Sequence, residues 1–268
     1  MQHQSYVSYR IEPPLEFSEI VTHFYVARND GSLPVTKTLI PTFQAILIFN
    51  FGAPGMLLFD ENTEAFQGKC LVLGPIKKPL GYTLAATSEI FVVNFKDDAF
   101  YRFFGNVMHG LDAPKNPDDF LENDCFEQLW QKLLQVGSDG KRIELLLDFC
   151  QPYLEERDPI ASQLTSFDDE TQNEVKAIAA DLKLTERTIQ KAYKKRFGFT
   201  AKEKARYQRF LRVIRDVGDA TTNVDWQQLT HRHNYYDQSH LIRDFKLYLG
   251  VSPQHYLKLR NDMCMGRP

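Results

Sequence analysis

The sequence predicts an α+β protein with a β-rich N-terminal half, a helical middle segment and an all-α C-terminal region. Up to about residue 95, short β-branched and aromatic runs alternate with turn residues, and beyond it apolar residues recur at helical spacing. The stretch from Lys183 to Arg215 carries 12 Lys or Arg and two acids, in a chain whose net charge is −3. A helix-turn-helix pattern occurs twice in the C-terminal region.

The N-terminal half is expected to be an antiparallel β-barrel or sandwich. Its strand-like runs are residues 17–28, 45–52, 55–62, 70–74 and 90–95. Turn residues separate them, among them Asn29-Asp30-Gly31 and Gly74-Pro75. Regularly spaced short strands with such turns are typical of small antiparallel barrels and sandwiches.

Helices are expected in the segment that follows, within residues 99–156. Their apolar residues form two stripes: Phe126, Leu129, Trp130, Leu133 and Leu134, and then Ile143, Leu146, Leu147, Cys150 and Leu154. The stripes either cover the β-structure and each other or form a dimer interface, and the sequence leaves both readings open. The polar segment 158–170 reads as a linker between a domain 1–157 and a domain 171–262.

The first helix-turn-helix unit begins with a helix predicted over residues 174–183. A short turn leads to Thr185, which is suited to cap a second helix, and Gly198 is suited to end it. Ile189, Tyr193 and Phe197 would face inward, because they fall at i, i+4 and i+8. The opposite face is cationic.

The second unit repeats this pattern with an offset of 52, so that Lys191 falls on Arg243 and Gly198 on Gly250. The first helices of the two units align with an offset of 51, which places Ala179 on Thr230 and makes the second turn one residue longer. Residues 201–217 carry a mixed apolar face and are expected to form a helix between the two units.

These blocks resemble the DNA-binding domain of the AraC family of bacterial transcription regulators, and the second block matches more closely. The matching residues there are Asp237, Ser239, His240, Arg243, Phe245, Lys246, Gly250, Ser252, Pro253 and Tyr256. The chain departs from the family pattern at Lys183, Ala201, Lys204, Thr230 and Asn234. The N-terminal half resembles the family's cupin-like sensor domain through residues 40–52, 71–75 and 92–105.

The resemblance implies a transcription regulator that binds double-stranded DNA, forms a homodimer, and has RNA polymerase and a small-molecule effector as further candidate partners. By position in the motif, the residues that face base edges are Arg187, Gln190, Lys191, Gln238, Ser239, Ile242 and Arg243. Thr188, Lys194, Lys195 and Lys246 would face phosphates. The alternative for Arg243 is an ion pair with Asp237 or Asp244, and His240 is expected to cap or pack rather than read bases. The first unit, which carries more charge, should supply most of the affinity.

Other functions are weighed against this one. No catalytic constellation or metal-ligand cluster is evident in residues 1–164, where His3, His23 and His109 lie far apart, so neither a cofactor nor enzymatic activity is expected. The four dispersed cysteines, with no signal peptide or long apolar run, favour a cytoplasmic protein. A constitutive DNA-binding dimer and a cupin-type enzyme remain as alternatives. An apolar pocket lined by Phe24, Tyr25 or Phe95 would favour effector sensing, whereas a filled barrel would favour constitutive binding.

Overall fold

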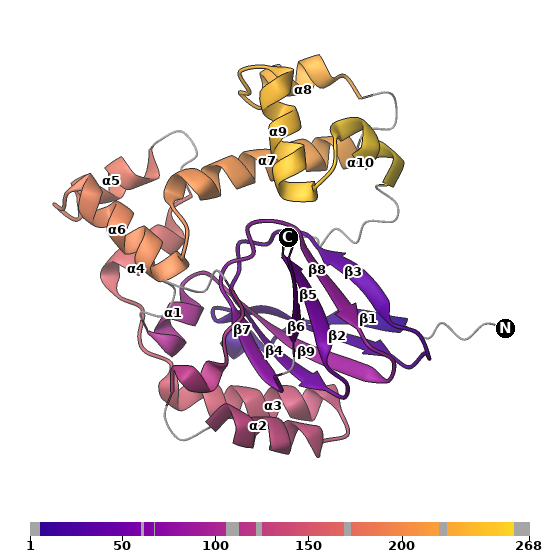
Figure 1. Ribbon diagram of the computed structural model, residues 1–268. Coiled ribbons are helices and arrows are strands. Elements are labelled where there is room, and N and C mark those ends of the chain that lie inside the picture. Colours follow the sequence, from indigo (N-terminus) through magenta and orange to yellow (C-terminus); the bar gives the residue numbers. More distant parts are fainter. Residues whose placement is uncertain are drawn as a thin grey trace.

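The computed structural model shows an α+β chain, and it describes residues 6–59, 62–66, 68–105, 113–121, 125–168, 173–219 and 224–259. His3, His109, Cys264 and the outer ends of the expected domains lie outside these residues. Two antiparallel sheets form the N-terminal half, helices α1 to α3 follow, and helices α4 to α10 make up the C-terminal part (Figure 1).

The two sheets have separate strand orders. The five-stranded sheet runs β1 (Tyr6–Ile11), β2 (Val21–Asn29), β9 (Ser88–Phe95), β4 (Ile46–Phe51) and β7 (Cys70–Leu73). The four-stranded sheet runs β3 (Val35–Leu39), β8 (Leu80–Leu84), β5 (Gly55–Phe59) and β6 (Asn62–Phe66). The antiparallel β-structure expected for this half is confirmed, but its described strands form two open sheets instead of one closed barrel.

Side-chain alternation gives the five-stranded sheet two buried faces. On β2, Phe24 and Val26 point toward the helices, whereas Tyr25 and Ala27 point between the sheets. The space between the sheets is filled by aliphatic side chains such as Ile46, Leu57, Leu84 and Val92. Phe24 and Phe95 belong to the helix-covered core, so they do not line the interior of the sandwich.

Three helices cover the outer face of the five-stranded sheet: α1 (Ala99–Phe104), α2 (Cys125–Leu134) and α3 (Asp139–Cys150) (Figure 1). This packing buries most residues of the two predicted apolar stripes. Phe126, Leu129, Leu133, Ile143, Leu146, Leu147 and Cys150 are buried there, although Leu134 remains 50% exposed. The reading in which the stripes cover the β-structure therefore explains their burial.

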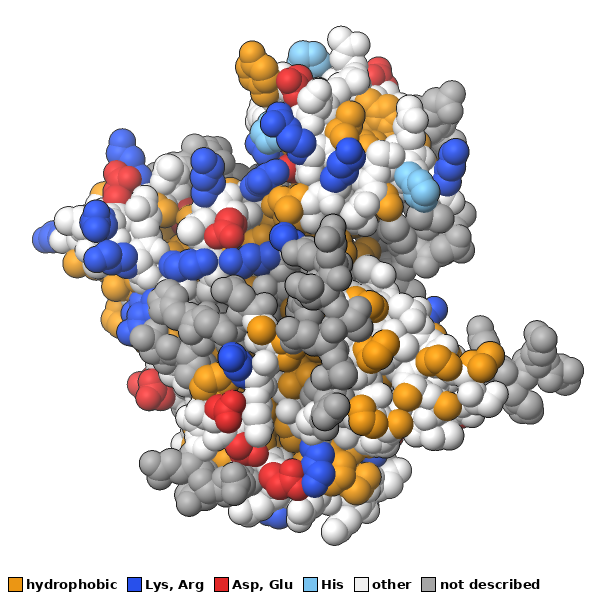
Figure 2. Space-filling view, viewed as in Figure 1, with side chains coloured by type: hydrophobic (Ala, Val, Ile, Leu, Met, Phe, Trp, Pro, Cys, Tyr) orange, Lys and Arg blue, Asp and Glu red, His pale blue; other side chains and the backbone are white. Residues whose placement is uncertain are grey.

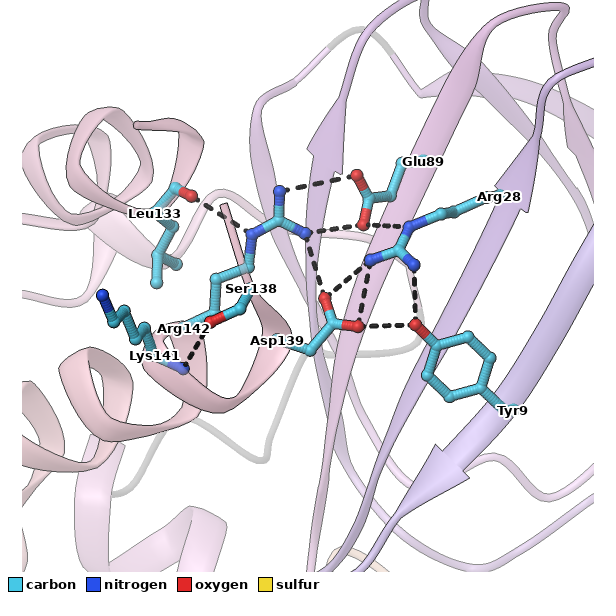
Figure 3. A network of polar contacts seen from close by, with 8 residues as sticks. All are labelled: Tyr9, Arg28, Glu89, Leu133, Ser138, Asp139, Lys141 and Arg142. Carbon is cyan, nitrogen blue, oxygen red and sulfur yellow. Dashed lines mark hydrogen bonds and ion pairs between the residues drawn. The ribbon is translucent and has the colours of Figure 1, made fainter. Parts of the chain in front are cut away.

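A network of charged groups fastens α3 to the sheet (Figure 3). Arg28 on β2 donates to Glu89 (2.9 Å) and to Asp139 at the start of α3 (2.7 Å). Arg142, one turn further along α3, donates to Glu89 (2.6 Å), and the Tyr9 hydroxyl donates to Asp139. Two guanidinium groups and two carboxylates thus balance each other at the helix–sheet boundary.

The segment expected to be a linker contains a helix, α4 (Pro159–Ser166). Asp158 caps it by accepting a hydrogen bond from the Ala161 amide (3.0 Å), and Pro159 occupies the first turn, where its missing N–H is harmless. Leu164 is 1% exposed because it packs with the next two helices. The polar composition of 158–170 hid this short amphipathic element.

The remaining helices are α5 (Glu174–Asp181), α6 (Glu186–Phe197), α7 (Ala201–Asp219), α8 (Trp226–Arg232), α9 (Gln238–Leu249) and α10 (Pro253–Leu259). They form one core around α5 and α6 and a second core around α7 to α10. Among the described helices, none combines the length and apolarity that a membrane span requires.

Candidate nucleic-acid interface

The first unit consists of α5, a connection of four residues that ends at the cap Thr185, and α6. Thr185 caps α6 by accepting a hydrogen bond from the Thr188 amide (3.1 Å), and Gly198 ends it with a φ of 72°. The turn passes through Lys183, whose φ is 54°, in the region where glycine is favoured. A helix-turn-helix geometry therefore forms at Lys183 without the glycine that the family pattern has there.

The second unit, α8 and α9, repeats this geometry. Asp237 caps α9 by accepting from the His240 amide (2.7 Å), Gly250 ends it with a φ of 72°, and Asn234 has a φ of 55°. One residue separates Lys183 from the first cap and two separate Asn234 from the second, which confirms the longer second turn. Tyr236 lies in that longer turn and is 93% exposed.

Two further departures from the family pattern have local explanations. The hydroxyl of Thr230 donates to the Trp226 carbonyl (2.6 Å), so this polar side chain is satisfied inside α8. The ammonium of Lys204 lies 3.5 Å from the Glu174 carboxylate and 5.8 Å from the Tyr193 ring centroid. Burial raises the pKa of Glu174, and the Lys204 charge acts against that rise. Lys204 thus anchors the start of α7 electrostatically, where an aromatic would pack.

Helix α7 joins the units, and a buried charge cluster fixes α9 against it. Asp244 on α9 has no exposed surface and accepts from Arg206 Nε (2.7 Å) and the Tyr235 hydroxyl (2.9 Å). Arg209 Nη2 lies 3.6 Å from the same carboxylate. Burial, followed by the Asp244 charge, raises the pKa of Tyr235, which keeps that hydroxyl a hydrogen-bond donor.

Two expectations for the second unit concern an ion pair of Arg243 with Asp237 or Asp244, and a capping or packing role for His240. Asp244 faces α7 and Asp237 caps α9, while the Arg243 guanidinium donates to the Ser239 carbonyl (3.3 Å) on its own helix. His240 packs edge-on against Tyr235 and lies 3.3 Å from Arg209. Burial and the Arg209 charge lower the pKa of His240, so a neutral ring packs in the unit.

Most of the expected DNA contacts lie on the exposed surface of the two recognition helices. Exposed side chains are Arg187, Thr188, Gln190, Lys191, Gln238, Ser239, Ile242, Arg243 and Lys246. In Figure 2, Lys and Arg gather over these C-terminal helices in the upper part of the view. Lys194 is half-buried and donates to the Gly198 carbonyl at the end of its helix (3.1 Å).

Lys195 is placed differently from the other candidates. Its ammonium lies 5.4 Å from the centroid of the Tyr101 ring, on helix α1 of the N-terminal half. Arg196 lies over the same ring (5.8 Å) and pairs with Asp158 (2.6 Å). The sequence pattern missed Tyr101 and Asp158, because contacts across so many residues leave no local periodicity.

No metal or cofactor arrangement emerges from the described residues. They contain no group of three or more His, Cys, Asp and Glu side chains that could hold a metal ion. His23 is buried, and desolvation together with the Arg10 charge lowers its pKa to about 4. Cys70, Cys125 and Cys150 are free thiols, and burial raises their pKa values.

Comparison with known proteins agrees with this geometry. Residues 178–259 match a helix-turn-helix domain family, so the C-terminal part is a DNA-binding domain of this class. It belongs to the AraC-type helix-turn-helix domains. Residues 9–113 match a domain of unknown function.

Similar solved structures add little to that assignment. Fatty-acid-bound ToxT from Vibrio cholerae has 12% identity and a TM-score of 0.42, with 91% of this chain and 98% of ToxT covered. A Cupin_2 domain of an XRE family transcriptional regulator from Enterobacter cloacae has 9% identity and a TM-score of 0.28, with 35% and 99% covered. Neither score is high enough to bear on function. A search of the curated proteins finds no match.

Proposed function

We propose that this protein is a sequence-specific DNA-binding transcription regulator. The observation that carries the proposal is the pair of equivalent helix-turn-helix units, each with an exposed polar face on its recognition helix. Because one helix, α7, connects the two units, both can bind the same DNA duplex. The excess of Lys and Arg around α6 and α7 supplies attraction to phosphates that does not depend on sequence.

Within the first unit, Arg187, Gln190 and Lys191 are assigned to base edges. Arginine pairs with guanine and glutamine with adenine through two hydrogen bonds each. Thr188 and Lys194 are assigned to phosphates, which orient the protein without reading sequence. Lys195 reaches a phosphate only by leaving the Tyr101 ring.

In the second unit, Gln238, Ser239, Ile242 and Arg243 are assigned to base edges and Lys246 to a phosphate. The Ile242 side chain, which is 37% exposed, offers an apolar contact for a thymine methyl group. This unit has the smaller cationic surface, so its main contribution is to specificity.

The N-terminal half is assigned the regulatory input, from a small molecule or a protein partner, and a role in homodimer formation. Support comes from its direct contact with the recognition unit, since Lys195 and Arg196 of α6 lie over the ring of Tyr101 on α1. RNA polymerase is the partner that a promoter-bound activator would contact.

A second candidate is a constitutive DNA-binding protein whose N-terminal half senses nothing. The packed interior of the sandwich favours it, because aliphatic side chains and Tyr25 fill the described space between the sheets. The cavity between the five-stranded sheet and α3, lined by Phe17, Phe95 and Cys150 among others, is apolar and no larger than about one water molecule. Full DNA affinity of the purified protein, unchanged by fractionated metabolite extracts, would support this second candidate.

A pair of charge-matched variants tests DNA recognition by α6. Arg187→Ala combined with Lys191→Ala should weaken binding to a selected site by roughly 30-fold or more, since each base-reading contact is worth about 1–3 kcal/mol. Lys132→Ala combined with Lys141→Ala removes the same charge from exposed positions on α2 and α3 and should leave affinity nearly unchanged. Equal losses from both pairs would reduce the role of α6 to non-specific attraction.

A further inference from the structure

One aromatic side chain of the N-terminal half packs against the cores of both helix-turn-helix units. Phe43, in the loop between β3 and β4, stacks on Tyr207 of α7 with ring centroids 4.4 Å apart and an interplanar angle of 17°. Its ring also meets Phe199 edge-on (5.1 Å), directly after the first unit, and Tyr248 of α9 (6.3 Å). Phe43 therefore lies at the junction of the two units.

The loop holds this ring in a fixed position. The amides of Thr42 and Phe43 both donate to the Ile76 carbonyl (3.1 and 3.0 Å), and the Ile76 amide donates back to the Gln44 carbonyl (3.1 Å). Phe43 itself has a φ of 56°, a left-handed conformation that is strained for an aromatic residue. Such a conformation persists only where surrounding contacts impose it.

Two polar contacts lie beside the aromatic one. The Tyr207 hydroxyl donates to the Pro41 carbonyl, in the same loop as Phe43. Lys77, next to Ile76, pairs with Glu203 in the first turn of α7 (3.2 Å). Together they fasten the N-terminal end of α7 to two loops of the sandwich.

We propose that Phe43 is a positioning residue for DNA recognition, which sets the relative orientation of α6 and α9 and so the spacing between the two DNA segments that they read. The inference rests on the proposed function. A helix that joins two units resists bending along its length. The Asp244 cluster and a shared core fix the second unit on α7, so the freer motion is rotation of the first unit, which has its own core, about its junction with α7. A ring inserted between Phe199, Tyr207 and Tyr248 restricts that rotation. A rigid connection favours one spacing, and a loosened one accepts several.

Phe43→Ala isolates the contribution of the ring. Alanine meets the same left-handed backbone restriction as phenylalanine, so the two residues differ mainly in the ring contacts. Phe43→Leu keeps an apolar side chain at the junction and should retain most of the wild-type behaviour. Phe17→Ala is the matched control, because Phe17 is a half-buried phenylalanine of the N-terminal half that packs on the helix-covered core.

The test measures binding to a selected two-segment site and to versions lengthened or shortened by one or two base pairs. Wild type, Phe43→Leu and Phe17→Ala should prefer one spacing. In Phe43→Ala, the ratio of the affinity for the preferred spacing to that for the altered spacings should fall about tenfold, while binding to single segments stays unchanged. A folded Phe43→Ala variant with the wild-type spacing preference would overturn the inference. If the wild type shows no defined site at all, the proposed function fails, and this inference with it.

A second measurement does not depend on DNA. Spin labels placed through unnatural amino acids at Glu186 on α6 and at Tyr236 before α9 report the distance between the units, since both positions are exposed. Phe43→Ala should broaden the distance distribution, and Phe17→Ala should leave it unchanged. Equal distributions in the two variants would contradict a positioning role.

Discussion

Asp244 offers the sharpest test of how the second recognition helix is held. The substitution Asp244→Asn keeps the shape of the side chain and removes its charge. Arg206 and the Tyr235 hydroxyl donate hydrogen bonds to the carboxylate, and the Arg209 guanidinium lies 3.6 Å from it as an ion-pair partner. The amide NH₂ of asparagine would therefore face either a guanidinium group, which cannot accept, or the Tyr235 hydroxyl, which could accept only by giving up its own donation.

The expected loss follows from burial. Removing one partner of a buried ion pair costs about 3–5 kcal/mol. The carboxylate of Asp244 is fully buried, but the Arg206 and Arg209 side chains are 39% and 23% exposed, so water compensates them in part. We therefore expect Asp244→Asn to lower the free energy of unfolding of the C-terminal helices by about 2 kcal/mol.

Tryptophan fluorescence during urea unfolding measures this loss. The chain has two tryptophans, and Trp226 packs edge-on against Phe245 beside Asp244 on α9 (5.7 Å). A Trp130→Phe background leaves Trp226 as the reporter of the C-terminal core. Asp219→Asn, an exposed acid on α7, is the control. An Asp244→Asn midpoint equal to that of the control would refute the anchoring role of Asp244.

Three further predictions concern the turn, the ranking of the units and acid stability. Lys183→Gly should stabilise the C-terminal helices by about 1 kcal/mol in urea unfolding, and Asn234→Gly by less, because asparagine tolerates a positive φ. At matched salt, Lys191→Ala should weaken binding to the selected site more than Arg243→Ala, and the reverse order would overturn the ranking of the two units. Because the pKa of His23 is lowered to about 4, the unfolded chain binds a proton below about pH 6.5 that the folded chain excludes. The contribution of neutral His23 to the free energy of unfolding of the N-terminal half should therefore be fully present above about pH 6.5 and fall by up to about 3 kcal/mol towards pH 4. In urea titrations across that range, His23→Gln should reduce the dependence of the unfolding free energy on pH. An unchanged dependence would exclude His23 as its cause.

The two helix-turn-helix units were readable from the sequence because their determinants are local. Thr185 and Gly198 mark the two ends of α6, and the offsets of 51 and 52 gave the extra residue in the second turn. The left-handed backbone at Lys183 was the least expected feature, since lysine carries no sign of a positive φ. The position of that turn followed from comparison with the family pattern, and not from the residue type at Lys183.

The N-terminal half was harder to read for a physical reason. Strand β3 contains the polar stretch Thr36 to Thr38, and β8 begins Leu80-Gly81, so neither presents the β-branched apolar run that marks β4 or β9. Closure into a barrel depends on pairing between strands far apart in the sequence, which local patterns do not encode. The same limit hid Phe43 and Tyr101, whose roles arise from contacts with α6 and α7.

Selection of genomic fragments by the purified protein, followed by binding to the enriched site across a salt series, tests sequence-specific recognition most directly. We expect a defined site made of two major-groove segments, with affinity that falls steeply as salt rises because several phosphates are contacted. Binding that is indifferent to sequence at every salt concentration would contradict it.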